Sequence, residues 1–210
     1  GRDISYVANY ADVSVNKNSS NVTGGGLIGR MENNENGAMK IAYYENYGDV
    51  KGILVGGAIG RVKYKGASFE KCVNYGDIEA GKVGGTSIAA GLVASFYAND
   101  ITMDMPISIF TACKNFGDIT SVDQAGGITG HTNPLKTITI KYSDCVNEGC
   151  IKGSTAGGIA AVVNSANTYF YRCRNYGNSS DSGFYGIVPQ TSYKRIQDAF
   201  SITNKGGLAK

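Results

Sequence analysis

A short phrase returns seven times along the chain, and this recurrence constrains the fold more than any other feature. Each copy begins with an asparagine, which is followed in most copies by an aromatic residue, a glycine, an acid and an aliphatic residue. The asparagines are Asn9, Asn46, Asn74, Asn115, Asn147, Asn175 and Asn204. Regular self-similarity is typical of stacked repeats, in which each copy is a unit that cannot bury its own apolar face. The sequence therefore predicts an architecture of stacked copies.

Mostly apolar residues stand at fixed distances from each asparagine. The column five residues upstream holds Ile4, Ile41, Phe69, Phe110, Tyr142, Phe170 and Ala199. The column two residues upstream holds Val7, Tyr44, Cys72, Cys113, Cys145, Cys173 and Ile202, and the column four residues downstream holds Val13, Val50, Ile78, Ile119, Ile151, Ser179 and Leu208. The residues between these columns, such as Lys71 and Lys114, are mostly polar. We expect the columns to point inward and the polar residues outward, because side chains alternate along a strand.

A second phrase, in which a glycine pair or its small-residue equivalent precedes a short aliphatic run, follows the first six asparagines. It predicts a tight bend and then another strand. The asparagines are 28 to 41 residues apart, and the extra residues of the long copies fall in polar stretches that read as loops. The expected fold is all-β: a parallel β-solenoid, specifically a right-handed β-helix, of about six coils stacked roughly 4.8 Å apart. A β-propeller blade needs about 40 residues, more than the shortest copies contain.

Composition limits the classes of function. Thirty glycines with only three prolines fit a turn-rich β protein. The net charge of +3 comes from interspersed signs, so no nucleic-acid partner is expected, and no apolar run is long enough for a membrane span. The repeats run from end to end without a linker, which predicts one domain over residues 1–210. Since the chain begins and ends inside the repeat, we expect this domain to be excised from a longer surface protein.

Four of the five cysteines share one repeat position, two residues before the asparagine. Other copies carry Val7 or Ile202 there, so the position is apolar and free cysteine fits it as a small hydrophobe. We therefore favour buried thiols over disulfides, with Cys150 as a separate case. His131 is the single histidine and no zinc-ligand spacing occurs, so no metal or cofactor is expected.

The asparagine column is interpreted as structural. An amide at a turn can hydrogen-bond neighbouring backbone groups and stack on the amides of adjacent coils. The glycine two residues later is expected to supply a left-handed conformation. This position holds Gly48, Gly76, Gly117, Gly149, Gly177 and Gly206.

An acidic column follows, with Asp12, Asp49, Asp77 and Asp118. Carboxylates on neighbouring coils can serve catalysis, and a cluster of oxygens can hold calcium, which needs six to eight ligands. The simpler interpretation is that each aspartate accepts a hydrogen bond from its own turn. We favour this turn interpretation over both catalysis and cation binding.

An aromatic row is the candidate ligand-binding surface. It consists of Tyr10, Tyr47, Tyr75, Phe116 and Tyr176, each directly after an inward asparagine, and Glu148 interrupts it. These rings should lie at an outer corner of the coil, where they suit a sugar or a protein partner. The alternative is that the stacked rings only protect the turn and each other.

The two phrases together, as seen at residues 25–29 and 72–78, resemble the GLUG-type repeat of large bacterial surface proteins. Among these proteins are adhesins and some immunoglobulin-A-cleaving peptidases. The resemblance implies a noncatalytic segment at the cell surface or in a secreted bacterial protein, and it brings no catalytic or binding residue with it.

Three functional hypotheses follow. The first is a noncatalytic, adhesin-like domain that binds or displays ligands, with a host glycan or an extracellular protein as partner. The second is a carbohydrate-active β-helix enzyme, a hydrolase or lyase, with its acids in the aspartate column or in the stretch from Asn99 to Pro106. The third is a structural spacer.

Overall fold

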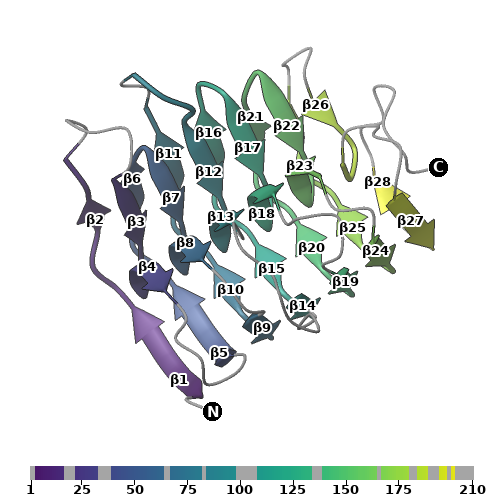
Figure 1. Cartoon of the computed structure of the whole chain (residues 1–210), viewed down its shortest axis with the longest axis horizontal. Coiled ribbons are helices and arrows are strands. Elements are labelled where there is room, and N and C mark those ends of the chain that lie inside the picture. Colours follow the sequence, from purple (N-terminus) through teal and green to yellow (C-terminus); the bar gives the residue numbers. More distant parts are fainter. Residues whose placement is uncertain are drawn as a thin grey trace.

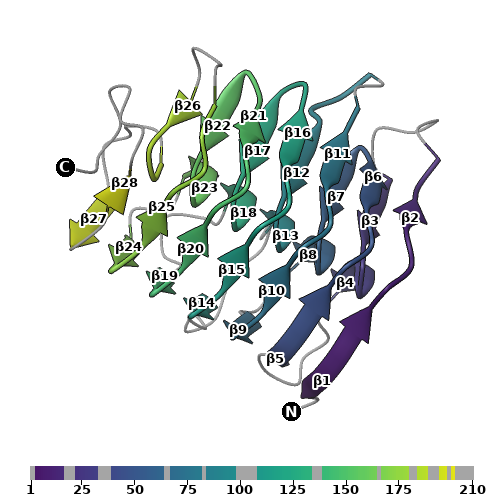
Figure 2. The same cartoon turned by 180° about the vertical axis from the view of Figure 1, so that it is seen from behind.

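The computed structural model shows an all-β protein whose chain winds into a parallel β-solenoid. Coils follow one another in chain order along the long axis of the molecule (Figure 1), and the same stack is seen from behind in Figure 2. The structure describes residues 3–16, 22–32, 39–63, 67–81, 84–97, 108–133, 139–164, 167–179, 184–188, 194–197 and 200–201. Within these ranges, no helix is long and apolar enough to cross a membrane.

Four parallel sheets run along the stack. Sheet A contains β1 (Ile4–Asn9), β5 (Met39–Asn46), β9 (Ala67–Glu70), β10 (Val73–Asn74), β14 (Ser108–Thr111), β15 (Lys114–Asn115), β19 (Thr139–Ser143), β20 (Val146–Asn147), β24 (Asn167–Tyr171), β25 (Arg174–Asn175), β27 (Lys194–Gln197) and β28 (Phe200–Ser201). Sheet B contains β2 (Val13–Ser14), β6 (Val50–Gly52), β11 (Ile78–Ala80), β16 (Ile119–Ser121) and β21 (Ile151–Lys152). Sheet C contains β3 (Thr23–Gly25), β7 (Leu54–Gly56), β12 (Ile88–Ala90), β17 (Gln124–Gly126), β22 (Thr155–Gly157) and β26 (Phe184–Tyr185). Sheet D contains β4 (Ile28–Glu32), β8 (Ile59–Lys63), β13 (Val93–Tyr97), β18 (Thr129–Asn133) and β23 (Ala160–Val163).

One coil visits the four sheets in order, as β5, β6, β7 and β8 do. Sheet D holds five strands, so four turns of the chain join β4 to β23 within the described residues. The expected count of about six coils is therefore slightly too high for coils that carry all four sheets. After β23 the described strands belong to sheets A and C only. In that last part Ser179 stands where earlier copies carry an aliphatic residue at the start of the sheet B strand.

The strand register aligns the repeat copies residue for residue. Asn74 pairs with Asn46 on one side and with Asn115 on the other, and Ile78 likewise pairs with Val50 and Ile119. From Asn9 to Asn175, like residues therefore stack on like residues, and each column of the sequence becomes a row along the solenoid. The predicted alignment of the seventh copy was wrong: Phe170 pairs with Ile196 in place of Ala199, and Asn175 pairs with Ser201 in place of Asn204.

A left-handed residue interrupts sheet A in six successive coils, three residues before the asparagine. These residues are Tyr6, Tyr43, Lys71, Ala112, Asp144 and Arg172, with φ between 48° and 58°. The kink places both Glu70 and Lys71 on the outside, between the buried side chains of Phe69 and Cys72.

The prediction that the glycines after the asparagines are left-handed was wrong for the five that the structure describes, and Gly206 lies outside the described residues. Gly84 is the one glycine of the described ranges with a positive φ. Glycine is required two residues after the asparagine for another reason: a Cβ at Gly76 would overlap the carbonyl oxygen of Gly48, and one at Gly117 would overlap that of Gly76. The constraint is therefore the close approach of adjacent coils.

The described residues form two main apolar compartments and a small third cluster. Side chains of sheets A and D, including Phe110 and Val93, contribute to the largest compartment, and side chains of sheets B and C, including Ile119 and Ala125, contribute to the second. The small cluster consists of Ile53, Leu54, Ile88 and Ala94. Between the two main compartments lie the asparagine column and a column of bend glycines. A Cβ at Gly91, for example, would meet the side chain of Asn115. We call this boundary the Asn–Gly seam.

An amide ladder runs through the seam. Each Nδ2 donates to the Oδ1 of the next asparagine at 2.7–2.8 Å, from Asn9 to Asn175. Each Nδ2 also donates to the carbonyl oxygen two residues later in its own turn, at 2.7–3.1 Å. Both amide hydrogens are thus used, which stabilises a polar group that is fully buried from Asn46 onward. Asn204 lies outside the described residues.

Candidate ligand-binding surface

The aromatic row lies at the outer corner where sheet A passes into sheet B. Tyr10, Tyr47, Tyr75 and Phe116 each follow a ladder asparagine, and all four side chains are exposed. Successive rings stack with centroids 4.9, 4.8 and 5.2 Å apart and with planes within 8° of parallel. We call these four rings the aromatic strip. It is continuous because the register repeats the same position in four successive coils.

Stacking decides which part of each ring a ligand can reach. Both faces of the two central rings, Tyr47 and Tyr75, lie against neighbouring rings, so the exposed parts of these rings are mainly the edges and the hydroxyl groups. The Tyr47 hydroxyl donates to Glu45 Oε2 at 2.9 Å, and this hydrogen bond raises the pKa of Tyr47 to about 12. A surface of edges and hydroxyl groups fits a protein side-chain environment better than the flat face of a sugar.

The row breaks at Glu148 and resumes with Tyr176, which is also exposed. On the same outer face, Arg172 makes a bidentate ion pair with Asp144 at 2.6 and 2.7 Å. The Arg172 guanidinium also lies over the ring of Tyr171, 4.2 Å from its centroid. The hydrogen bonds from Arg172 lower the pKa of Asp144. Glu148 therefore separates Tyr176 from the continuous strip.

A second outer ring column was not recognised in the sequence. Tyr6 stacks on Tyr43 with centroids 4.7 Å apart, and Lys71 Nζ lies 5.0 Å from the centroid of the Tyr43 ring. These residues occupy the left-handed position, where later coils carry alanine, aspartate and arginine. With only two rings in the column, the sequence offers no recurring signal for it.

The aspartate column forms a different ladder from the one predicted. Oδ1 of Asp12, Asp49 and Asp77 accepts the backbone N–H of the next aspartate at 2.8–2.9 Å, and Asp118 accepts that of Cys150 at 2.8 Å. The acceptor role holds, but the donor belongs to the next coil and not to the residue's own turn, because stacking brings that N–H within reach. The described part of the chain contains no group of three or more metal-ligating side chains.

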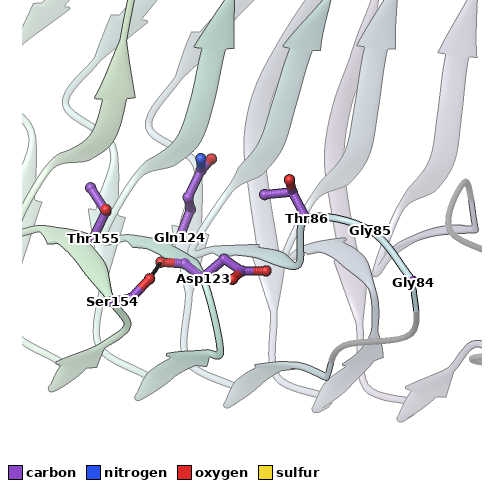
Figure 3. Close-up of a pocket in the computed structure, with 7 residues that line it drawn as sticks. All are labelled: Gly84, Gly85, Thr86, Asp123, Gln124, Ser154 and Thr155. Atoms are coloured by element: carbon purple, nitrogen blue, oxygen red, sulfur yellow. Dashed lines mark hydrogen bonds between the residues drawn. The ribbon is translucent and has the colours of Figure 1, made fainter.

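An open depression of about 520 Å³ lies beside sheet C and is lined by Gly84, Gly85, Thr86, Asp123, Gln124, Ser154 and Thr155 (Figure 3). Asp123 is the one carboxyl group in this lining, and its Oδ2 accepts from the backbone N–H and the hydroxyl group of Ser87 at 2.8 and 3.1 Å. A glycosidase uses two carboxyl groups about 5 to 9.5 Å apart. The residues that line the depression supply only one of them. The other predicted catalytic stretch, Asn99 to Pro106, lies outside the described residues.

The cysteine column lies in the largest apolar compartment. Cys72, Cys113, Cys145 and Cys173 are fully buried, and each thiol lies 3.5–3.6 Å from backbone carbonyl oxygens of its own and the preceding coil. Burial raises the pKa of Cys145, which favours the unreactive thiol. Cys150 is exposed, at the position of the aspartate column.

Comparisons with known proteins give no independent assignment: no protein family matches the sequence, and no curated protein or solved structure does so either. The arrangement of the residues themselves is therefore the basis for a functional proposal.

Proposed function

We propose that this chain is a noncatalytic, adhesin-like domain of a bacterial surface or secreted protein, and that it binds an extracellular protein through the aromatic strip. One observation carries the proposal: four exposed rings stack without interruption along a rigid rod. Contiguous exposed apolar surface often marks an interaction site. The resemblance of the paired phrases to GLUG-type repeats supports a location outside the cell.

The strip suits a protein partner for two reasons. Tyrosine supplies a large contact area with a polar group, at the cost of ordering few rotatable bonds. Stacking already restricts the conformation of each ring, so the rings lose little conformational entropy when a partner binds. The backbone of the strip residues is also held in place. Each strip residue directly follows a ladder asparagine whose side-chain amide hydrogens are both hydrogen-bonded.

Binding to immobilised extracellular matrix proteins, with a glycan array in parallel, tests the proposal. The Tyr47→Ala, Tyr75→Ala double variant should bind the protein partner at least about tenfold more weakly, because loss of a central ring typically costs about 2 kcal/mol. A matched control is the Lys51→Ala, Glu79→Ala double variant, which removes an exposed ion pair of 3.4 Å from sheet B. Thermal unfolding of both variants shows whether the fold is retained.

Unchanged binding by a folded strip variant would exclude the strip as the binding surface. Failure of the unaltered protein to bind any matrix protein would instead favour the spacer hypothesis.

A further inference from the structure

The connection from sheet B to sheet C is longer in one coil than in the two coils that follow it. Residues 81–87 join β11 to β12, whereas residues 122–123 and 153–154 make the same connection in the next two coils. The described end of the long connection, residues 84–87, forms one wall of the depression beside sheet C (Figure 3). The depression therefore lies beside a departure from the repeat.

Hydrogen bonds hold the long connection against the next coil. Ser87 is fully buried, and its backbone N–H and its hydroxyl group both donate to Asp123 Oδ2, at 2.8 and 3.1 Å. In return, the backbone N–H of Asp123 donates to Ser87 Oγ at 3.0 Å, and the hydroxyl group of Ser121 donates to the Ser87 carbonyl oxygen at 3.0 Å. The wall of the depression is thus already formed in the free protein, which lowers the ordering cost of binding.

Three polar groups of the lining keep hydrogen-bonding capacity for a ligand. Gln124 Oε1 lies 2.8 Å from Nδ1 of His131, whose Nε2 lies 3.5 Å from Asn164 Nδ2. Because an amide nitrogen only donates, the imidazole ring accepts at Nε2 and donates from Nδ1 to Gln124. His131 thus orients the Gln124 amide, and Gln124 Nε2 has no hydrogen-bond partner among the described residues. In the same part of the chain, the hydroxyl groups of Thr86 and Thr155 have no partner either.

These three groups come from three successive coils and line the same depression. Gln124 and Thr155 pair in the register of sheet C, so they lie one coil spacing apart, about 4.8 Å. Thr86 lies two positions before Ile88, which pairs with Gln124 on its other side. Figure 3 shows the side chains of Thr86, Gln124 and Thr155 on one side of the strands. A ligand in the depression can therefore contact all three groups at once.

The chemistry of the lining selects the class of ligand. Asp123 is the one carboxyl group of the lining, which contains no lysine, arginine or histidine to neutralise an anion. A calcium ion takes six to eight oxygen ligands, with several carboxylates among them in most sites, and here it would meet one carboxylate. An apolar molecule would leave the available hydroxyl and amide groups without partners. A neutral molecule with several hydroxyl groups satisfies them.

We propose that the depression binds the terminal monosaccharide or disaccharide of a neutral glycan through Thr86, Gln124 and Thr155. Sugar hydroxyl groups both donate and accept, so they complement the two threonine hydroxyl groups and the Gln124 amide N–H. The volume of about 520 Å³ lies within the range of small-molecule sites, about 300–1,000 Å³. The site goes beyond the proposed protein contact, because it differs from the aromatic strip in both its ligand and its residues.

Saturation-transfer difference NMR of the whole chain tests the site by titration with glucose, galactose, mannose, N-acetylglucosamine, lactose and cellobiose. At least one of these sugars should bind. Thr86→Val, Gln124→Met and Thr155→Val should each weaken that binding about fivefold, because each removes about one hydrogen bond to the ligand. The triple variant should show no detectable binding. Thr120→Val, at an exposed threonine of sheet B, is the matched control and should leave the affinity unchanged.

Absence of binding by all of these sugars would overturn the site, and so would an unchanged affinity of a folded triple variant. Tighter binding of inorganic phosphate or calcium than of every sugar would overturn the proposed class of ligand. Circular dichroism of each variant excludes loss of fold as the cause of weaker binding.

The Tyr47→Ala, Tyr75→Ala double variant separates this site from the aromatic strip. It should keep its affinity for the sugar, since neither tyrosine lines the depression. Loss of sugar binding by this variant would place the sugar on the strip and would contradict the site. Matrix binding by the same variant is a separate measurement, so the two proposals fail separately.

Discussion

Asn115 illustrates what a single buried amide does in this fold. It donates to Asn147 Oδ1 at 2.7 Å and to the Gly117 carbonyl oxygen at 2.8 Å, and its own Oδ1 accepts from Asn74 at 2.8 Å. Asn115→Ala leaves buried groups on three residues without these partners. We expect the free energy of unfolding to fall by about 1–3 kcal/mol or more, since each unpaired buried group costs about that much. Urea unfolding measures the difference.

Lys114→Ala is the matched control for that change, because Lys114 is the exposed neighbour in the same strand. It should alter the free energy of unfolding by less than about 0.5 kcal/mol. Equal stability of Asn115→Ala and Lys114→Ala would show that the ladder does not stabilise the fold.

Buried acids make the stability of the protein sensitive to alkaline pH. Burial raises the pKa values of Cys145, Tyr44 and Tyr142 in the folded state. In the unfolded chain these groups ionise near their ordinary values of about 8.5 for cysteine and about 10 for tyrosine. Their contribution to stability is complete below pH 8.5, approximately, and is lost as the pH rises further.

We therefore expect the free energy of unfolding to fall above about pH 8.5, by roughly 1.4 kcal/mol per pH unit for each such group. Denaturant unfolding between pH 7 and 10, approximately, measures this slope. Cys145→Val should reduce the slope, because it removes one buried thiol. Valine fits this repeat position, since Val7 occupies it in the first copy. A stability that is level across this range would contradict the prediction.

At the scale of the element, the turn after each asparagine depends on the distance between coils. A Cβ at Gly117 would overlap the carbonyl oxygen of Gly76, which is backbone and cannot move aside. We expect Gly117→Ala to destabilise the protein by about 3 kcal/mol or more, at the upper end of overpacking costs. Thermal unfolding measures the loss.

Gly84→Ala provides the comparison. Gly84 has a φ of 65°, but a Cβ there would contact nothing within 4 Å. Its cost should be only the conformational one, about 1–2 kcal/mol. If Gly84→Ala proved the more damaging change, conformation and not coil spacing would be the reason for glycine in these turns.

The sequence predicted the elements that repeat and missed those that depend on contact between coils. The inward columns and the outer corner of Tyr47 follow from spacing alone, because register carries each column along the solenoid. The left-handed residue escaped notice because Lys71, Ala112 and Asp144 share no chemistry and include no glycine. The stacking of the strip rings on one another depends on the distance between coils. The sequence of a single repeat copy does not reveal this distance.

At the scale of the whole molecule, each coil contacts mainly its neighbours, so stability should be graded along the rod. In the first coil, β1 is largely exposed, whereas Asn115 and Ile119 in a central coil are fully buried. We expect backbone amides of residues 3–16 to exchange hydrogen faster than those of residues 108–133. Hydrogen exchange read by mass spectrometry tests this gradient. Equal protection of the two segments would indicate one cooperative unit instead.

The parallel stacking of the coils also determines how the molecule responds to mechanical force. Hydrogen bonds between coils run along the rod, so tension that pulls the first and last coils apart loads one interface at a time. Each coil that peels away frees at least 28 residues. That is on the order of 100 Å of extended chain, in exchange for about 4.8 Å of rod. Under such tension the solenoid should lengthen in steps, and each step dissipates part of the applied work.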